Sequence, residues 1–373
     1  MTEQKRKRGG FGFLILGVAA LVGLQLVLSH FLAGSLLPTR KAQWIWLDEE
    51  PEEPGPVAFY AVREFELEET PTAATLFAAA DEEAVIFING VPVGGSRYTN
   101  GDSLRSCDVF DAVRVGTNRI VAEVRSVRGV GGLIARLVVT SKSGKSQIVT
   151  DSDWQIYREP QENLFESDLE LPAGEIPRVW GPAPTGRWML SSRPKRVPTI
   201  AELQTSAKAE SAQRFRLPTG DRRWQPLGQT DRSSPALGHW VTFDFGREIT
   251  AYLALRFPSE AREESKPVGL LYLGRKPRIL NRSRADGYVV AMPGQRMWLN
   301  GRPRRFRYAT YVGLLPVSGA DAYPVDEQRA DKLGVTEDER VGAFGLPVGE
   351  LGPSLEDEVW GELHRLTSVA DAE

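Results

Sequence analysis

The amino-acid sequence predicts an all-β protein, in which two antiparallel β-sandwich domains of the jelly-roll type follow one N-terminal transmembrane helix and precede a short C-terminal helix. Three observations predict this class. Residues 11–37 contain no Asp, Glu, Lys or Arg. From Lys41 onward, short segments of alternating polarity replace this apolar run, and that alternation is the period of half-buried strands. No helical interlude separates the segments, which is typical of sandwiches.

Composition limits the possible classes of protein. The chain has 373 residues, more than a single core usually holds, and its 41% hydrophobic and 25% charged residues indicate a folded chain. The formal net charge of -3 gives no support for a nucleic-acid partner. Cys107 is the only cysteine, so an intramolecular disulfide and a cysteine zinc cage are both excluded. We expect no metal and no cofactor.

The N-terminus predicts a membrane anchor. Residues 1–10 form a basic tail, and residues 11–37 exceed the roughly 20 residues that cross a hydrocarbon core of about 30 Å. The basic residues from Lys5 to Arg8 outnumber Arg40 and Lys41, which places the N-terminus in the cytoplasm and the globular part in the periplasm or outside the cell. The alternative is a cleaved signal peptide, although the apolar run is long for one.

Strand-like segments then occur in two series. The first covers residues 42–158 and contains Asn89-Gly90, a strong signal for a two-residue hairpin turn of type I′. A proline-rich stretch over 159–198 indicates a connector that packs along a domain surface. The second series covers 199–345. Residues 346–373 are acidic and predict a helix capped by Ser354 that places Leu355, Val359, Leu363 and Leu366 on one face.

The order of several short motifs resembles one family, the bacterial α-L-rhamnosidases. In the first series these motifs are Trp44-Ile45-Trp46, Arg63-Glu64-Phe65, Ile88-Asn89-Gly90, Gly116-Thr117-Asn118 and Asp151-Ser152-Asp153-Trp154. In the second they are 241–249, Arg284-Ala285-Asp286-Gly287-Tyr288, Phe306-Arg307-Tyr308 and Tyr311-Val312-Gly313. The resemblance covers about Ala42 to Gly345 and implies a galactose-binding-like sandwich over 42–158, followed by a second sandwich.

Departures from the family change the expected function. Its members continue into an (α/α)₆ barrel that carries the catalytic carboxylates, whereas this chain stops where the first barrel helix would start. No catalytic residue is therefore transferred to this sequence. A membrane anchor is also atypical of the family.

Candidate ligand-binding residues lie in two places. Tyr98, Asn100 and Asp102, near Asp108 and Asp111, offer oxygen ligands for a sugar or a calcium ion, although Asp and Asn also stabilise ordinary turns. Trp298, beside Asn300, is predicted to be an exposed loop aromatic that stacks on a sugar. Four other tryptophans lie at strand starts or alternating positions and are predicted to be in the core; they are Trp44, Trp46, Trp154 and Trp240.

Two arginine-rich segments, 275–284 and 302–307, suggest contact with acidic glycans or anionic lipids, or with the acidic C-terminal segment. The leading hypothesis is a non-catalytic, membrane-anchored protein that binds glycan, polysaccharide or another cell-surface ligand. The alternatives are a structural component of an envelope complex, bound to envelope proteins, and one part of a truncated or split α-L-rhamnosidase-type glycoside hydrolase.

Overall fold

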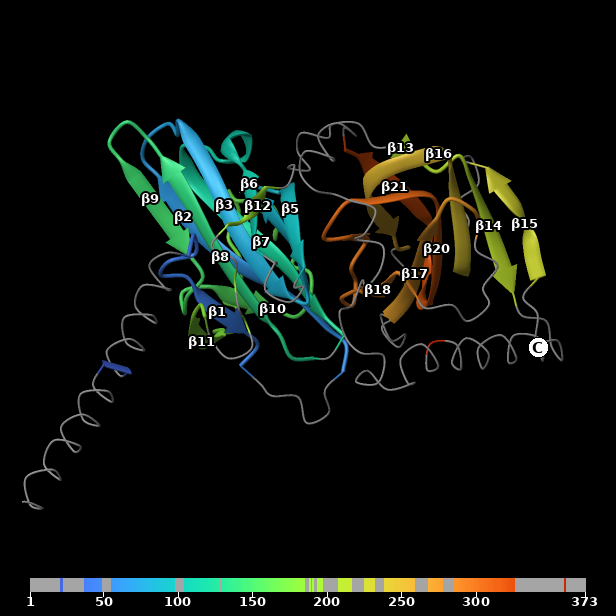
Figure 1. Cartoon of the computed structure of the whole chain (residues 1–373), viewed down its shortest axis with the longest axis horizontal. Helices are drawn as coiled ribbons and strands as arrows, with labels where there is room; N and C mark the ends of the chain where they lie inside the picture. Colours follow the sequence, from blue (N-terminus) through green and yellow to red (C-terminus); the bar gives the residue numbers. More distant parts are fainter. Residues whose placement is uncertain are drawn as a thin grey trace, which may run out of the picture.

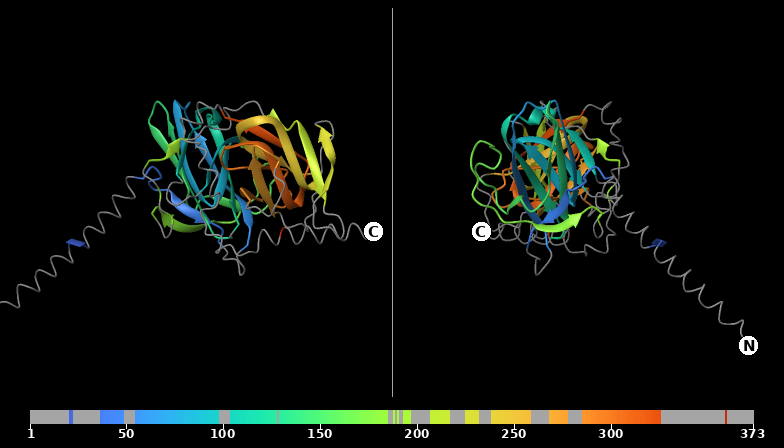
Figure 2. Two further views of the ribbon diagram at one scale, coloured as in Figure 1. Left: turned by 45° about the vertical axis from the view of Figure 1, so that its right-hand side comes forward. Right: turned by 90° about the vertical axis from the view of Figure 1, so that its left-hand side faces the viewer.

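The computed structural model describes residues 21–22, 37–48, 55–97, 104–127, 129–184, 188, 190, 193–196, 207–216, 225–231, 238–258, 268–277, 285–325 and 359. These residues form three β-sheets in two domains that lie side by side (Figures 1 and 2). Except for the short parallel pair β6 and β12, neighbouring strands are antiparallel. The predicted all-β class is confirmed.

The first domain is a sandwich of two sheets. The strands of its larger sheet are β1 (Gln43–Trp46), β3 (Ala73–Asp81), β6 (Arg105–Asp108), β8 (Gly132–Thr140), β9 (Lys145–Val149), β11 (Arg178–Pro182) and β12 (Lys195–Arg196). The smaller sheet contains β2 (Val57–Leu67), β4 (Glu83–Ile88), β5 (Val91–Arg97), β7 (Gly116–Ser126) and β10 (Gln155–Tyr157). A 3₁₀ turn, η1, covers Phe110–Ala112.

The core of the first domain lies between these sheets. Alternate residues of β2, such as Phe59 and Ala61, pack against residues of the opposite sheet, such as Leu76 and Leu137. Trp46 and Trp154 belong to this core, and Trp44 packs in an adjoining cluster, where its ring lies 4.9 Å from that of Trp188. Together with Trp240 in the second domain, these tryptophans are buried as predicted.

The turn between β4 and β5 has the predicted geometry. Asn89 and Gly90 have φ values of +50° and +78°, the positive values that a type I′ turn requires. The Asn89 amide donates to the Ala112 carbonyl at 2.9 Å and to Asn118 Oδ1 at 2.8 Å, and its oxygen accepts from the Arg119 N–H at 3.0 Å. The turn is therefore fixed by side-chain hydrogen bonds as well as by its backbone preference.

The proline-rich segment predicted as a connector contributes strands to the first domain. β11 extends the larger sheet beside β1, and β12 adds to β6. Glu175 also forms a two-way backbone bridge with Ile156. Trp180 and Trp188 pack with Trp44, which is why this segment follows the domain surface.

The second domain is built from one sheet that curls around its own core. Its strands are β13 (Ala207–Lys208), β14 (Ser211–Arg216), β15 (Gln225–Asp231), β16 (Gly238–Arg256), β17 (Val268–Gly274), β18 (Gly287–Val290), β19 (Met297–Leu299), β20 (Arg304–Val317) and β21 (Gly319–Pro324). The sequence predicted a second sandwich of separate strands. Instead, the first half of β16 pairs with β14 and its second half pairs with β21.

A bend in β16 allows this curl. The pairing of β16 with β20 shifts between Asp244 and Ile249, and Gly246 in this interval has φ of +74°. An L-residue with a side chain is strained in that conformation, so glycine is suited to the bend. Phe243 before the bend and Leu253 after it then point into the same core.

Two predicted terminal elements lie largely outside the described residues. Among the described residues, no helix is long and apolar enough to cross a bilayer. Of the predicted anchor, the description includes Leu21, Val22 and Leu37, so the anchor stays a prediction. Of the predicted C-terminal helix it includes Val359, which is helical and buried in the same hydrophobic cluster as Trp240 and Leu314.

Candidate functional site at the domain seam

The two domains meet on the outer face of the smaller sheet of the first domain. Because side chains alternate along a strand, Tyr60 and Val62 of β2 point away from the core that Phe59 and Ala61 fill. They pack instead in a cluster with Tyr252, Leu299 and other residues of the second domain. We call this contact the seam.

A buried ion pair lies within the seam. Arg125 and Glu123 stand two residues apart on β7, so both point outward, and their side chains are 3% and 2% exposed. Arg125 Nε donates to Glu123 Oε1 at 2.7 Å, and Nη1 donates to the Leu299 carbonyl at 2.7 Å and to Glu83 Oε2 at 3.2 Å. The guanidinium carbon lies 4.7 Å from the centre of the Trp298 ring. Arg125 therefore joins the two domains.

Second-domain groups complete this network. Gln295 Nε2 donates to Glu123 Oε1 and to the Met297 carbonyl, both at 2.7 Å. The Gly301 N–H donates to Glu83 Oε1 at 2.9 Å. Gly301 also approaches Gly95 so closely that a Cβ on Gly95 would lie 2.2 Å from the Gly301 carbonyl oxygen. The seam thus combines apolar packing with hydrogen bonds to a buried charge pair, which fixes the domains against each other.

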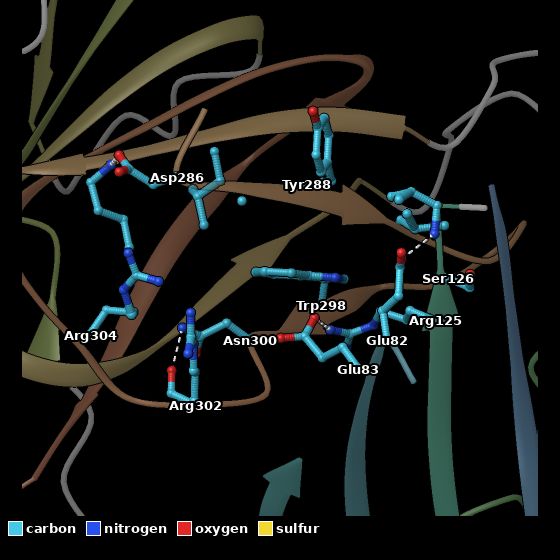
Figure 3. Close-up of a pocket in the computed structure, with 15 residues that line it drawn as sticks. Glu82, Glu83, Arg125, Ser126, Asp286, Tyr288, Trp298, Asn300, Arg302 and Arg304 are labelled. Atoms are coloured by element: carbon cyan, nitrogen blue, oxygen red, sulfur yellow. Dashed lines mark hydrogen bonds and ion pairs between the residues drawn. The ribbon is translucent and has the colours of Figure 1, made fainter. Parts of the chain in front are cut away.

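A small pocket opens beside Arg125, and we call it the Trp298 pocket. Figure 3 shows Trp298 in its middle, with Tyr288 on one side and Glu82, Glu83 and Arg125 on another. The cavity volume is about 40 Å³, which suits a few water molecules or one polar group of a larger ligand. Both domains line it, through Glu82, Glu83, Arg125, Ser126, Val127, Leu271, Leu273, Asp286, Gly287, Tyr288, Val290, Trp298, Asn300, Arg302 and Arg304.

The charges of the Trp298 pocket balance, because its lining contains three carboxylates and three guanidinium groups. The carboxylates also accept hydrogen bonds from the protein. Glu82 Oε2 accepts from the Val127 N–H at 2.7 Å, and Asp286 Oδ2 accepts from the Leu273 N–H at 2.8 Å. Such a pocket favours a neutral polar ligand over an ion.

The indole N–H of Trp298 is a buried donor beside this pocket. Within the described part of the chain, no hydrogen-bond acceptor reaches Trp298 Nε1, although the nitrogen is buried. A buried donor left without a partner costs about 1–3 kcal/mol, so a ligand oxygen placed here would be stabilised. Asn300 has a different role, because its Oδ1 accepts from the Leu253 N–H at 2.9 Å and its Nδ2 donates to the Arg302 carbonyl at 2.6 Å.

The structure brings together two of the five predicted site residues, Trp298 and Asn300. The expectation that Trp298 is an exposed loop aromatic is wrong: it lies in β19, is 1% exposed and is covered by Arg125. Tyr98, Asn100 and Asp102 lie outside the described residues. Asp108, which follows them in the sequence, accepts a hydrogen bond at Oδ1 from the Phe110 N–H at 3.2 Å, as expected for a turn. The described residues contain no group of three His, Cys, Asp or Glu side chains that could hold a metal ion.

The arginine-rich segments have partners near the bend of β16. Arg275 and Arg305 both form ion pairs with Glu248. Arg307 binds both oxygens of Asp244, at 2.9 and 3.0 Å, and this hydrogen bonding, with that from the Gly246 N–H, lowers the pKa of Asp244. Arg302 and Arg304 line the Trp298 pocket, and Arg278, Arg282 and Arg284 lie outside the described residues.

Sequence reasoning missed Glu82, Glu83, Arg125 and the seam itself. A signal was present, because residues 84–88 are apolar without alternation. A continuous apolar run indicates a strand that is buried on both faces. The outer face of this sheet therefore required a cover, which the second domain supplies.

The fold and this site define a two-domain all-β protein with a charge-balanced pocket at its seam. No protein-family model matches the chain. An α-L-rhamnosidase of Streptomyces avermitilis is 30% identical over 157 residues, which are 39% of this chain and 15% of that enzyme. A solved α-L-rhamnosidase from Dictyoglumus thermophilum gives 14% identity and a TM-score of 0.44, with 76% of this chain and 35% of that chain covered. A solved α-L-rhamnosidase from Aspergillus terreus gives 17% identity and a TM-score of 0.45, with 77% of this chain and 36% of that chain covered.

The chain thus resembles α-L-rhamnosidases at the level of domains, as the motifs predicted, and it spans about a seventh of the curated enzyme and about a third of the solved ones. The sequence match over 157 residues carries this resemblance.

Proposed function

We propose that this chain is a membrane-anchored, non-catalytic carbohydrate-binding protein whose Trp298 pocket accepts a hydroxyl group of the sugar. The observation that carries the proposal is the buried indole N–H of Trp298, which has no acceptor among the described residues and belongs to a side chain that lines a pocket shared by both domains. A sugar hydroxyl supplies the missing acceptor. The balanced charge of the lining suits a neutral sugar.

The sequence match supports the choice of sugar class. The matching protein is an α-L-rhamnosidase, so L-rhamnose and rhamnose-containing oligosaccharides are the first ligands to examine. The apolar run over 11–37, with its basic N-terminal flank, supports the anchor and the placement of the domains on the non-cytoplasmic side.

Calorimetric titration of the full chain in detergent micelles tests sugar binding. We expect binding of a rhamnose-containing oligosaccharide, and we expect Trp298→Phe, which keeps an aromatic ring but removes the N–H, to weaken it about 2- to 10-fold, the effect of one neutral hydrogen bond. Trp44→Phe is the matched control, because it makes the same change in a buried cluster of the first domain outside the pocket. If Trp298→Phe and the unchanged chain bind the oligosaccharide with equal affinity, the pocket is excluded as the site that accepts the sugar hydroxyl.

A hydrolysis assay separates binding from catalysis. The same match also favours a second candidate function, a rhamnosidase-related hydrolase. We expect no release of p-nitrophenol from p-nitrophenyl α-L-rhamnoside by the purified chain. Turnover above that of a mock purification would support the hydrolase and contradict the non-catalytic proposal.

Membrane fractionation tests the anchor. We expect the full chain to stay in the pellet after alkaline carbonate extraction and a variant without residues 1–37 to move to the supernatant. Release of the full chain by carbonate would contradict the anchor and favour a cleaved signal peptide.

A further inference from the structure

A second and larger cavity opens at Glu123, two residues along β7 from Arg125. Its volume is about 730 Å³, within the range of about 300–1,000 Å³ that is usual for small-molecule sites. The first domain contributes the outer face of β2, β4 and β7 and the segment around Phe165, and the second domain contributes the turn at 294–297. We call it the Phe165 cavity.

Three aromatic side chains form one wall of this cavity. The Phe165 ring lies 4.9 Å from Phe87 and 5.8 Å from Tyr60, edge to face with both. The segment that carries Phe165 is held by Arg119, whose Nη1 donates to the carbonyls of Asn163 at 2.6 Å and Glu166 at 2.8 Å. The wall is therefore pre-organised, which lowers the entropy cost of binding.

Polar groups stand beside the aromatic wall. Tyr60 and Glu123 are direct neighbours across the β2–β7 pair, and both line the cavity. Among the described residues, the hydrogen bonds from Arg125 and Gln295 to Glu123 reach the same oxygen, Oε1. Burial and the nearby Glu123 raise the pKa of Tyr60, so its phenol keeps its proton. The cavity thus offers a carboxylate oxygen as acceptor and a hydroxyl as donor or acceptor.

The charges around the cavity favour a neutral ligand. Arg125 compensates Glu123, and the exposed residues Glu162 and Arg296 at the cavity have opposite charges. Aromatic faces suit the apolar face of a ring, and the polar groups suit hydroxyls at its edge. We propose that the Phe165 cavity binds a neutral hydroxylated ring of mono- to disaccharide size, stacked on Phe165, with hydroxyls on Glu123 and Tyr60. This second sugar subsite rests on the proposed function.

Titration of the full chain in micelles with L-rhamnose and a rhamnose disaccharide tests this subsite. We expect Phe165→Ala to weaken binding at least 10-fold through loss of the stacking face, and Tyr60→Phe to weaken it less. Tyr157→Phe is the matched control: Tyr157 lies in the same seam cluster, but its hydroxyl donates to Pro172 and Gln155 away from the cavity. Gln161→Trp, which fills the cavity from its half-buried edge and leaves Phe165 in place, should repeat the loss.

The outcomes separate the two proposals. Binding that is lost in Phe165→Ala and Gln161→Trp but kept in Trp298→Phe supports the cavity and refutes the role of the Trp298 pocket. If Trp298→Phe weakens binding and both cavity variants bind as tightly as the unchanged chain, the cavity proposal is overturned and the proposed function stands. Absence of sugar binding by the unchanged chain overturns both.

Discussion

Truncation of Arg125 to alanine removes the positive partner of a carboxylate that stays buried. In the folded chain Glu123 is 2% exposed, and Arg125 also holds the Leu299 carbonyl of the other domain. Removal of one partner of a buried ion pair typically costs about 3–5 kcal/mol, because the remaining charge has lost its counter-ion and is still mostly shielded from water. Loss of the hydrogen bond to the Leu299 carbonyl lowers the stability further. We therefore expect Arg125→Ala to lower the free energy of unfolding by about 3–5 kcal/mol.

Equilibrium urea unfolding followed by tryptophan fluorescence measures this loss, since Trp298 lies under the guanidinium group. Arg63→Ala is the matched control, because Arg63 pairs with Asp153 at 3.0 Å on the surface, where an ion pair contributes about 1 kcal/mol or less. The double variant Glu123→Leu with Arg125→Met removes both members of this pair; Glu83 loses Arg125 too, but it is 14% exposed and keeps its hydrogen bond from the Gly301 N–H, so the double variant should be clearly more stable than Arg125→Ala. A loss below about 1 kcal/mol for Arg125→Ala, the surface-pair value, would refute the role given to this pair.

Four further predictions follow from the fold. Gly246→Ala, at φ of +74°, should cost about 1–2 kcal/mol of unfolding free energy in the same assay, and a midpoint equal to that of the unchanged chain would contradict the strained bend. Asn89→Ala, which loses three hydrogen bonds, should cost about 2–3 kcal/mol, more than Asn163→Ala at a half-buried turn position. The pKa of Asp244 is lower in the folded chain than in the unfolded chain. Its contribution to stability is therefore complete above the unfolded pKa of about 3.9 and is lost as the pH falls through the folded pKa. Asp244→Asn should make the urea midpoint less dependent on pH over that acid range. The buried Cys107 thiol should react with Ellman's reagent only after unfolding, and rapid labelling of the folded chain would contradict its burial.

The sequence predicts best those features that depend on neighbours in the chain. The alternation of Phe59 and Ala61 with Tyr60 and Val62 is local, and so is the requirement for positive φ at Asn89 and Gly90. The structure confirms both, and it confirms the four buried tryptophans. The bend in β16 is harder to predict from the sequence, because Gly246 alone does not show that the two halves of one strand face a common core.

The site depends on contacts between residues that are far apart in the sequence. Gln295 binds Glu123, 172 positions away, and Gly301 binds Glu83, 218 positions away. An alternating charged residue normally indicates a solvent-facing position, so Glu123 and Arg125 carried no local sign of burial. Asn300 and Gly301 after Trp298 indicate a loop, yet Trp298 forms part of a short strand beside β16.

The contact between Arg125 and Leu299 affects which positions can change their amino acid among homologous sequences. Arg125 donates to a main-chain carbonyl, which every amino acid supplies, so position 299 can exchange its side chain for another of similar shape without losing this hydrogen bond. Glu123 and Gln295 instead meet through their side chains, and a substitution at either one removes the contact. Among homologues we therefore expect positions 123, 125 and 295 to change together or not at all, while position 299 varies among apolar residues.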